Sequence, residues 1–195
     1  MKTVKAMLLD VDYLREERSI IRLFFKTSKG KIVLTDPSFE PYFYITVNCD
    51  PEQAVRKLME REFNGVKIKR IEIVERTMLG EEKPVKALKL IFNSTKEVKD
   101  SRETIREQEF VTHKREYDIP FSKRYLIDRD LEPLAMYEVT YDEKTLELKE
   151  MRKINEKPFE LNCSSPWTLR FAPTFSFNIA SLSFYGNNVT VGTIG

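Results

Sequence analysis

The chain has 195 residues, of which 41% are hydrophobic and 33% charged, so it can bury a core of domain size, and no apolar run is long enough to span a bilayer. The only histidine, His113, and the two distant cysteines, Cys49 and Cys163, argue against histidine-based metal sites, catalytic triads and a zinc site. A formal net charge of +2 does not by itself predict a nucleic-acid binder, so any affinity for DNA has to come from local clusters of Lys and Arg.

The first part of the chain is predicted to form strands over residues 4–13, 20–26 and 31–35, which are rich in β-branched and apolar residues. The first of these soon meets Asp10 and Asp12, and no small-residue cleavage site follows, so we expect no signal peptide. Together with the two isolated cysteines, this favours a reducing, cytoplasmic location. The two carboxylates could indicate a metal site, but without further ligands a salt bridge to a nearby Lys or Arg is the favoured interpretation.

The first helix follows a strand over residues 42–47. Asp50-Pro51 is typical of a helix start, with Asp as the N-cap and Pro in the first turn. Apolar residues then recur every four positions as far as Phe63, which predicts one apolar helix face. We expect this helix to end at Asn64-Gly65, because both residues tolerate the left-handed conformation of a helix terminus.

The remaining elements complete a recognisable order. Strands over residues 66–78 and 85–92, a helix over 95–108 and a strand over 110–117 follow the first helix. From residue 42 onward, the order is therefore strand, helix, strand, strand, helix, strand. This predicts an α+β fold, namely a ferredoxin-like β-α-β-β-α-β antiparallel sheet domain with extra N-terminal strands.

The C-terminal part changes in composition near residue 160. A short helix over residues 121–127 and strands over 135–141 and 145–151 precede the change, and residues 161–195 contain a single charged residue, Arg170. We therefore divide the chain into a domain over residues 1–132, a connector with strands over 133–160, and a β segment over 161–195.

The helix predicted over residues 95–108 has an unusual apolar face. Arg102 lies between Val98 and Ile105 on the same stripe, where a guanidinium is costly unless something accepts its hydrogen bonds. One interpretation is an arginine that extends along the helix surface to reach water. The other is an arginine that lines a polar pocket or meets a phosphate.

Two aromatic segments carry further candidate chemistry. Ile119-Pro120-Phe121 is a stiff apolar wedge, and Lys123 and Arg124 follow it directly. Aromatic and basic residues interleaved in this way suit stacking on a base beside a neutralised phosphate, and the alternative is a turn that anchors the core. The segment 39–44, with Pro41 before three aromatic residues, fits the same use, although a half-buried edge strand is favoured there.

Four stretches together resemble the N-terminal domain of archaeal family B DNA polymerases. They are LLDVDY (8–13), IIRLF (20–24), FEPYFY (39–44) and REYDIPFSKRYLID (115–128), and the last is the most specific. The resemblance covers residues 7–132. It implies a pocket that captures uracil in template DNA ahead of the polymerase site. By motif, this pocket would be formed by Tyr13, Pro41, Tyr42, Val98, Arg102, Ile119, Pro120, Phe121 and Arg124.

The segment 175–183 resembles the first exonuclease motif of the same polymerases, at the start of an RNase H-like exonuclease domain. Asn178 and Ala180 stand where that motif has its two carboxylates. Two-metal phosphodiester cleavage needs those anionic oxygens, so we expect no exonuclease activity and no bound metal. An ordinary buried strand is the alternative interpretation.

These observations favour a non-catalytic protein that binds single-stranded DNA and recognises uracil in it, without a cofactor or a membrane. Hypoxanthine as a second accepted base and replication proteins as partners remain open. Three alternatives remain: an N-terminal fragment of an active DNA polymerase, a single-stranded RNA-binding module, and a protein-interaction subunit of a replication complex. Ferredoxin-like sheets often bind RNA, but the chain contains no glycine–aromatic signature such as KGFGFV.

Overall fold

The computed structural model describes residues 1–160 except 16, 78–83 and 116–118. The chain divides into two compact units, Met1–Phe159 and Glu160–Gly195. The β segment expected over 161–195, with Asn178 and Ala180, lies outside the described residues. In the part that is described, no helix is long and apolar enough to cross a membrane.

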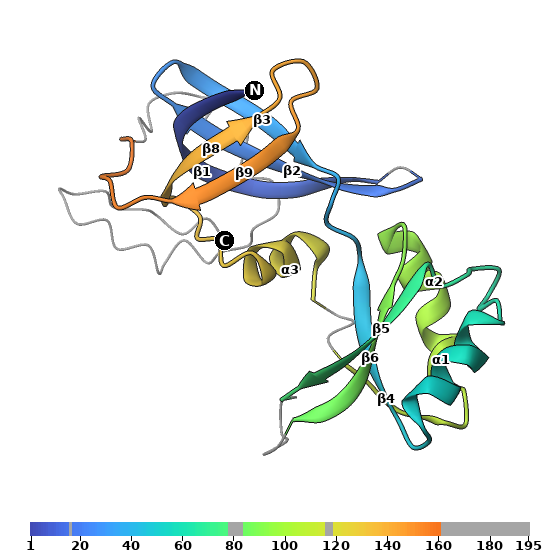
Figure 1. The fold of residues 1–195 in the computed structure, drawn as a ribbon. Helices are drawn as coiled ribbons and strands as arrows, with labels where there is room; N and C mark the ends of the chain where they lie inside the picture. Colours follow the sequence, from blue (N-terminus) through green and yellow to red (C-terminus); the bar gives the residue numbers. More distant parts are fainter. Residues whose placement is uncertain (16, 78–83, 116–118, 161–195) are drawn as a thin grey trace, which may run out of the picture. The chain divides into compact units, whose positions relative to one another are not determined.

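The N-terminal strands form a sheet of their own (Figure 1). It contains five strands in the order β3-β2-β1-β8-β9, namely Gly30–Asp36, Ser19–Thr27, Lys2–Arg15, Met136–Tyr141 and Leu148–Lys153. Of the two strands expected in the connector, β8 pairs with β1, with Lys2 opposite Tyr141, and β9 pairs with β8, with Tyr137 opposite Lys153. Alternate residues of β2 are buried, as expected for a sheet with one face on a core.

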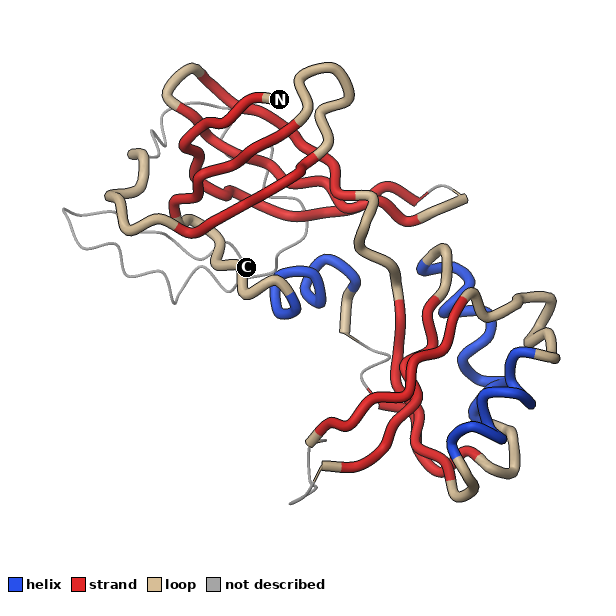
Figure 2. The backbone as a smooth tube through the Cα atoms, viewed as in Figure 1, coloured by secondary structure: helices blue, strands red, loops and turns tan. Residues whose placement is uncertain are grey.

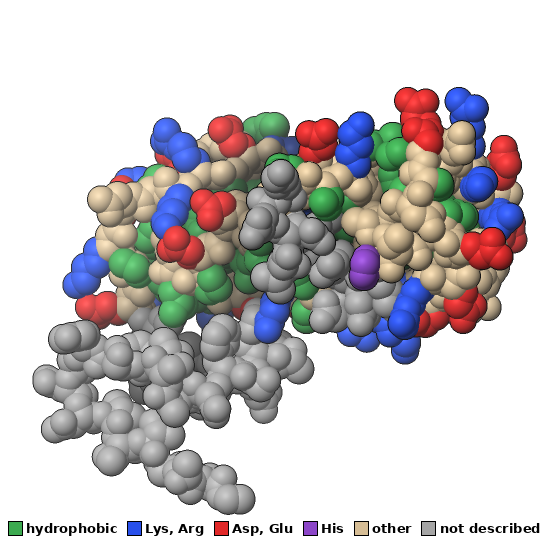
Figure 3. Space-filling view, turned by 90° about the horizontal axis from the view of Figure 1, so that it is seen from below, with side chains coloured by type: hydrophobic (Ala, Val, Ile, Leu, Met, Phe, Trp, Pro, Cys, Tyr) green, Lys and Arg blue, Asp and Glu red, His purple; other side chains and the backbone are tan. Residues whose placement is uncertain are grey.

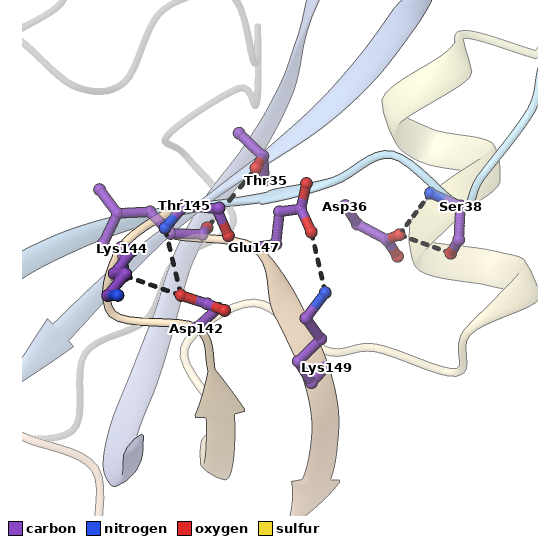
Figure 4. A network of polar contacts seen from close by, with 9 residues as sticks. Thr35, Asp36, Ser38, Asp142, Lys144, Thr145, Glu147 and Lys149 are labelled. Carbon is purple, nitrogen blue, oxygen red and sulfur yellow. Dashed lines mark hydrogen bonds and ion pairs between the residues drawn. The ribbon is translucent and has the colours of Figure 1, made fainter. Parts of the chain in front are cut away.

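The two edges of this sheet approach each other at the β8–β9 turn (Figure 4). Thr35 of β3 forms a parallel bridge with Glu147, and its N–H donates to the Leu146 carbonyl oxygen over 2.9 Å. Asp142 holds the turn, because its carboxylate accepts the backbone N–H groups of Lys144 and Thr145. This closure surrounds a core that includes Leu8, Ile21, Leu23, Phe25, Leu34, Tyr137 and Val139.

The second sheet confirms the expected ferredoxin-like arrangement. Its strand order is β5-β6-β4-β7, namely Arg70–Arg76, Val85–Ile91, Tyr42–Val47 and Val111–Arg115, and all of its pairs are antiparallel. Helices α1 (Pro51–Met59) and α2 (Thr95–Arg106) lie on one side of it (Figure 2). Ala54, Leu58 and Ile105 of the helices share a core with strand residues such as Phe43 and Leu88.

Helix α1 is shorter than the apolar spacing predicted. It ends at Met59, whose side chain is 46% exposed, and Glu60 is its C-cap. Asn64 and Gly65 do have positive φ, 54° and 77°, but they form a tight turn between Phe63 and Val66, which exchange two backbone hydrogen bonds. Such turns require positive φ at both central residues, so the Asn-Gly signal was a hairpin turn rather than a helix end.

Helix α3 (Phe121–Asp128) contacts both sheets. The Tyr125 hydroxyl donates to Asp36, at the end of β3, over 2.8 Å, and the Tyr42 hydroxyl, at the start of β4, donates to Asp128. Away from α3, the Ser19 N–H of β2 donates to the Asn93 carbonyl oxygen over 3.0 Å. Side chains and backbone thus join the two sheets within the first unit.

Candidate functional site

A cavity of about 290 Å³ lies in the first unit, where β1, the entrance of β4, α2 and α3 meet. The residues that the resemblance to family B polymerases assigned to a pocket come from four separate segments, and all of them line this one cavity. They are Tyr13, Pro41, Tyr42, Val98, Arg102, Ile119, Pro120, Phe121 and Arg124.

Two further residues, Thr95 and Lys99, complete the lining and were missed in the sequence. Both lie on α2, and Thr95, Val98, Lys99 and Arg102 follow the spacing i, i+3, i+4 and i+7, which places them on one helix face. The same spacing could have identified them once Val98 and Arg102 were assigned. Arg102 therefore faces the cavity, with its Nε 3.5 Å from a Glu103 carboxylate oxygen.

Two capping hydrogen bonds hold the first turn of α2 in place. The Ser94 hydroxyl accepts the Glu97 N–H over 3.2 Å, and the Glu97 carboxylate accepts the Asn93 N–H over 2.8 Å. The Thr95 N–H takes part in neither of these bonds and donates to the Ser19 hydroxyl over 2.9 Å. The cavity-lining face of α2 is thereby fixed against the β1–β2 hairpin.

Phe121, which lines the cavity, is the centre of an aromatic cluster. The Phe121 ring lies edge-on to Tyr13, with centroids 5.2 Å apart, and 5.3 Å from Phe39, which in turn packs against Tyr125. Phe121 is also part of the core of the five-stranded sheet, so it both anchors the core and lines the cavity. Pro120 stands before it as the N-cap of α3, with extended backbone.

The polar wall is built around Tyr42. Arg124 is buried, 3% exposed, and its guanidinium lies over the Tyr42 ring at 4.5 Å from the centroid, while the Lys89 ammonium lies 4.1 Å from the same centroid. Burial, followed by the hydrogen bond to Asp128, raises the pKa of the Tyr42 hydroxyl. A tyrosine hydroxyl is protonated at neutral pH even at its ordinary pKa, and the raised pKa further favours this form, which donates to the carboxylate.

Cations gather at the cavity, whereas charges of both signs are interspersed over the face shown in Figure 3. Lys99, Arg102 and Arg124 all line it, and no acidic side chain does so among the described residues. Arg15, at the end of β1, adds a guanidinium 5.3 Å from the centroid of the Tyr13 ring. The cavity thus combines an aromatic wall with a cationic one, which suits a flat heteroaromatic ring linked to an anion.

The pair Asp10 and Asp12 forms no common site. Asp12 binds Arg22 through two hydrogen bonds of 2.8 and 2.6 Å, as the salt-bridge interpretation predicted. Asp10 is 7% exposed, accepts the Val11 N–H, and has a pKa raised by burial. Within the described residues, no three His, Cys, Asp or Glu side chains come close enough together to hold a metal ion.

A second cavity, of about 260 Å³, lies on another side of α3. Asp36 and Ser38 line it together with Tyr125 and Arg129, and part of this wall is visible in Figure 4. Phe121 and Arg124 thus face the first cavity, and Tyr125 and Arg129 face the second.

Comparisons with known proteins match this chain to DNA polymerases. The family model for the exonuclease domain of DNA polymerase family B matches residues 112–190, a range that contains Asn178 and Ala180. The DNA polymerase of Thermococcus kodakarensis is 40% identical over 131 residues, which are 66% of this chain and 8% of that protein. DNA polymerase 1 of Pyrococcus abyssi is 39% identical over 131 residues, 66% of this chain and 17% of its own length.

The solved structure of the family B DNA polymerase from the hyperthermophilic archaeon Pyrobaculum calidifontis matches the fold with a TM-score of 0.67 at 27% identity, over 80% of this chain and 21% of that one. The chain therefore spans less than a fifth of the length of the curated relatives cited above, and about a fifth of the solved structure. Sequence and fold agree that this chain is similar to the N-terminal region of archaeal family B DNA polymerases.

Proposed function

We propose that this chain binds single-stranded DNA, that its cavity recognises uracil, and that it catalyses no reaction by itself. The observation that carries the proposal is the convergence of residues from four distant segments into one cavity with an aromatic and a cationic wall. At about 290 Å³, the cavity lies at the small end of the range of ligand pockets, which suits a single pyrimidine ring.

Shape is the proposed means of telling uracil from thymine. Uracil lacks the C5 methyl group of thymine, so an apolar wall that contacts the ring edge excludes thymine by a clash. Val98, Pro41 and Phe121 supply the apolar surface, and Tyr13 and Tyr42 cover the base. The base has to leave the stack to enter, which costs least in a single strand.

Charge is the proposed means of holding the strand. Lys99, Arg102 and Arg124 neutralise phosphates next to the recognised nucleotide, a contact that carries affinity without sequence information. Cytosine is rejected because its hydrogen-bonding edge differs from that of uracil, and backbone groups of the cavity read that edge.

The direct test is a titration with matched oligonucleotides that carry uracil, thymine or cytosine at one internal position. We expect the uracil strand to bind on the order of tenfold more tightly than the thymine strand, the difference that one methyl group makes in a fitted pocket. Equal affinity for the two strands would eliminate uracil recognition. An RNA strand of the same sequence serves as a further arm, and its preferential binding would favour an RNA-binding module instead.

Replacing Lys99 by glutamine tests the phosphate contact. In single strands each neutralised phosphate adds about 0.7 to the slope of log affinity against log salt concentration, so we expect Lys99→Gln to make the slope shallower by about 0.7. The variant Lys96→Gln is the matched control, because Lys96 is exposed on the same helix and does not line the cavity. An unchanged slope for Lys99→Gln, or equal changes in both variants, would remove Lys99 from the site.

A further inference from the structure

The orientation of Tyr42 depends on more than its own strand. Tyr42 begins β4, where pairing with Ile91 of β6 fixes its backbone. Tyr42 is 6% exposed, and the centroid of its ring lies 5.3 Å from that of the Tyr44 ring. These contacts pack the faces and edges of the ring. They leave the hydroxyl end, which is the end farthest from the backbone, to be held by other groups.

The hydroxyl end is held by α3. Asp128 accepts the hydroxyl hydrogen, and the guanidinium of Arg124 lies over the ring, 4.5 Å from its centroid. Arg124 and Asp128 are four residues apart and therefore lie on one face of the helix. Arg124 lines the cavity, whereas Asp128 does not line it and contacts one of its lining residues, Tyr42.

Asp128 is poorly placed for the stability of its own helix. It is the last residue of α3, where the carboxylate meets the negative end of the helix dipole. The helix has eight residues, and Pro120 at its N-cap makes no side-chain capping bond. An isolated helix of this length is marginal in water, so its position rests on its contacts with the sheets. The unfavourable charge of Asp128 is thus compensated by a contact outside the helix, the one with Tyr42.

We infer that Asp128 is a positioning residue of the cavity: it holds the Tyr42 hydroxyl so that the ring stays against the base, and it thereby sets the selectivity for uracil. This inference rests on the proposed function. A hydroxyl bond to a charged acceptor restricts the ring more than packing alone, because ring tilts that packing tolerates break the bond. A cavity that excludes a single methyl group loses selectivity when one wall can tilt away.

The test uses the full chain and the uracil and thymine oligonucleotides described above. In Asp128→Ala we expect the ratio of the two affinities to fall about threefold, within the range that the loss of one hydrogen bond produces. A ratio above one then remains, so a second, independent loss could still be measured. Alanine is a strong helix former and removes the charge that opposes the dipole, so α3 itself is not weakened. In Asp128→Asn, the side-chain carbonyl can still accept the hydroxyl, so most of the ratio returns.

Two further variants show whether Asp128 acts through Tyr42. We expect Tyr42→Phe to lower the ratio as much as Asp128→Ala, and the double variant to lower it no further. Asp36→Ala is the matched control, since it breaks the other Tyr–Asp bond of α3, to Tyr125, which faces the second cavity. We expect it to leave the ratio unchanged.

The outcomes separate this inference from the function on which it rests. A wild-type chain that binds both strands equally overturns both. A wild-type chain that prefers uracil, with the same ratio in Asp128→Ala, overturns the positioning role alone. Additive losses in the double variant, or an equal loss in Asp36→Ala, assign the effect to the placement of α3 as a whole and overturn the specific role of Asp128.

Discussion

Replacing Val98 by glutamine is expected to abolish the preference for uracil, bringing the ratio of uracil to thymine affinity from on the order of tenfold to about one. Val98 lines the cavity and also packs against the core beneath α2, so a longer side chain at this position cannot turn inward and extends into the cavity. Glutamine thereby fills the space that the base would occupy. General affinity for single strands stays near its wild-type value, because the cations that line the cavity remain.

The matched control for Val98→Gln is Val55→Gln. Val55 is a half-buried valine on α1 that packs against the same core and does not line the cavity. Both variants place a polar amide beside that core, so they should lose similar stability, as measured by urea denaturation. Only Val98→Gln should change the ratio of affinities. A Val98→Gln chain that still discriminates between the bases shows that the base enters elsewhere.

Truncating Phe43 is expected to have the largest effect on stability, a loss of about 3–5 kcal/mol in the free energy of unfolding for Phe43→Ala. Phe43 is fully buried in the core of the ferredoxin-like sheet and stacks on Phe92, with centroids 5.6 Å apart and rings 6° from parallel. Its removal leaves a cavity at the centre of that core. A single domain is stable by about 5–15 kcal/mol, so the loss is a large share of the total.

Phe24→Ala is a suitable comparison for Phe43→Ala. Phe24 lies on β2 between two buried neighbours, and its half-buried ring contacts Arg22 at 5.6 Å. Because the Phe24 ring is only partly buried, we expect a smaller loss, of about 1 kcal/mol. Equal losses in the two variants, measured by chemical denaturation, would show that Phe43 does not sit at a packed centre.

Residue pattern alone was enough to predict much of this protein. Periodicity and turn residues located most of the helices and strands, and the order from residue 42 onward predicted the ferredoxin-like sheet that the strand order confirms. Strand β4 was predicted with its observed bounds, Tyr42–Val47. These features are local, because the apolar residues on the buried face of a strand or helix recur at a fixed spacing over a few neighbouring positions.

Features that depend on contacts between distant segments could not be predicted from the spacing of residues. The extra N-terminal strands form a separate sheet, and β8 joins it by pairing with β1, although more than a hundred residues separate the two strands. Similarly, Phe63 continues the apolar spacing of α1 but lies in a turn beyond the end of the helix. Periodicity indicates that a residue is buried, but the tertiary fold determines which element packs against it.

The candidate site likewise has some features that the sequence predicts and others that require the tertiary structure. The amino-acid sequence showed which residue types were available, and its resemblance to the polymerases predicted which of them form a pocket. The tertiary structure was needed to show that they line one cavity, that Thr95 and Lys99 line it too, and that Asp128 accepts a hydrogen bond from the hydroxyl of Tyr42. The physical reason is that a cavity is a property of the gaps between packed elements, and no single segment of the chain encodes such a gap.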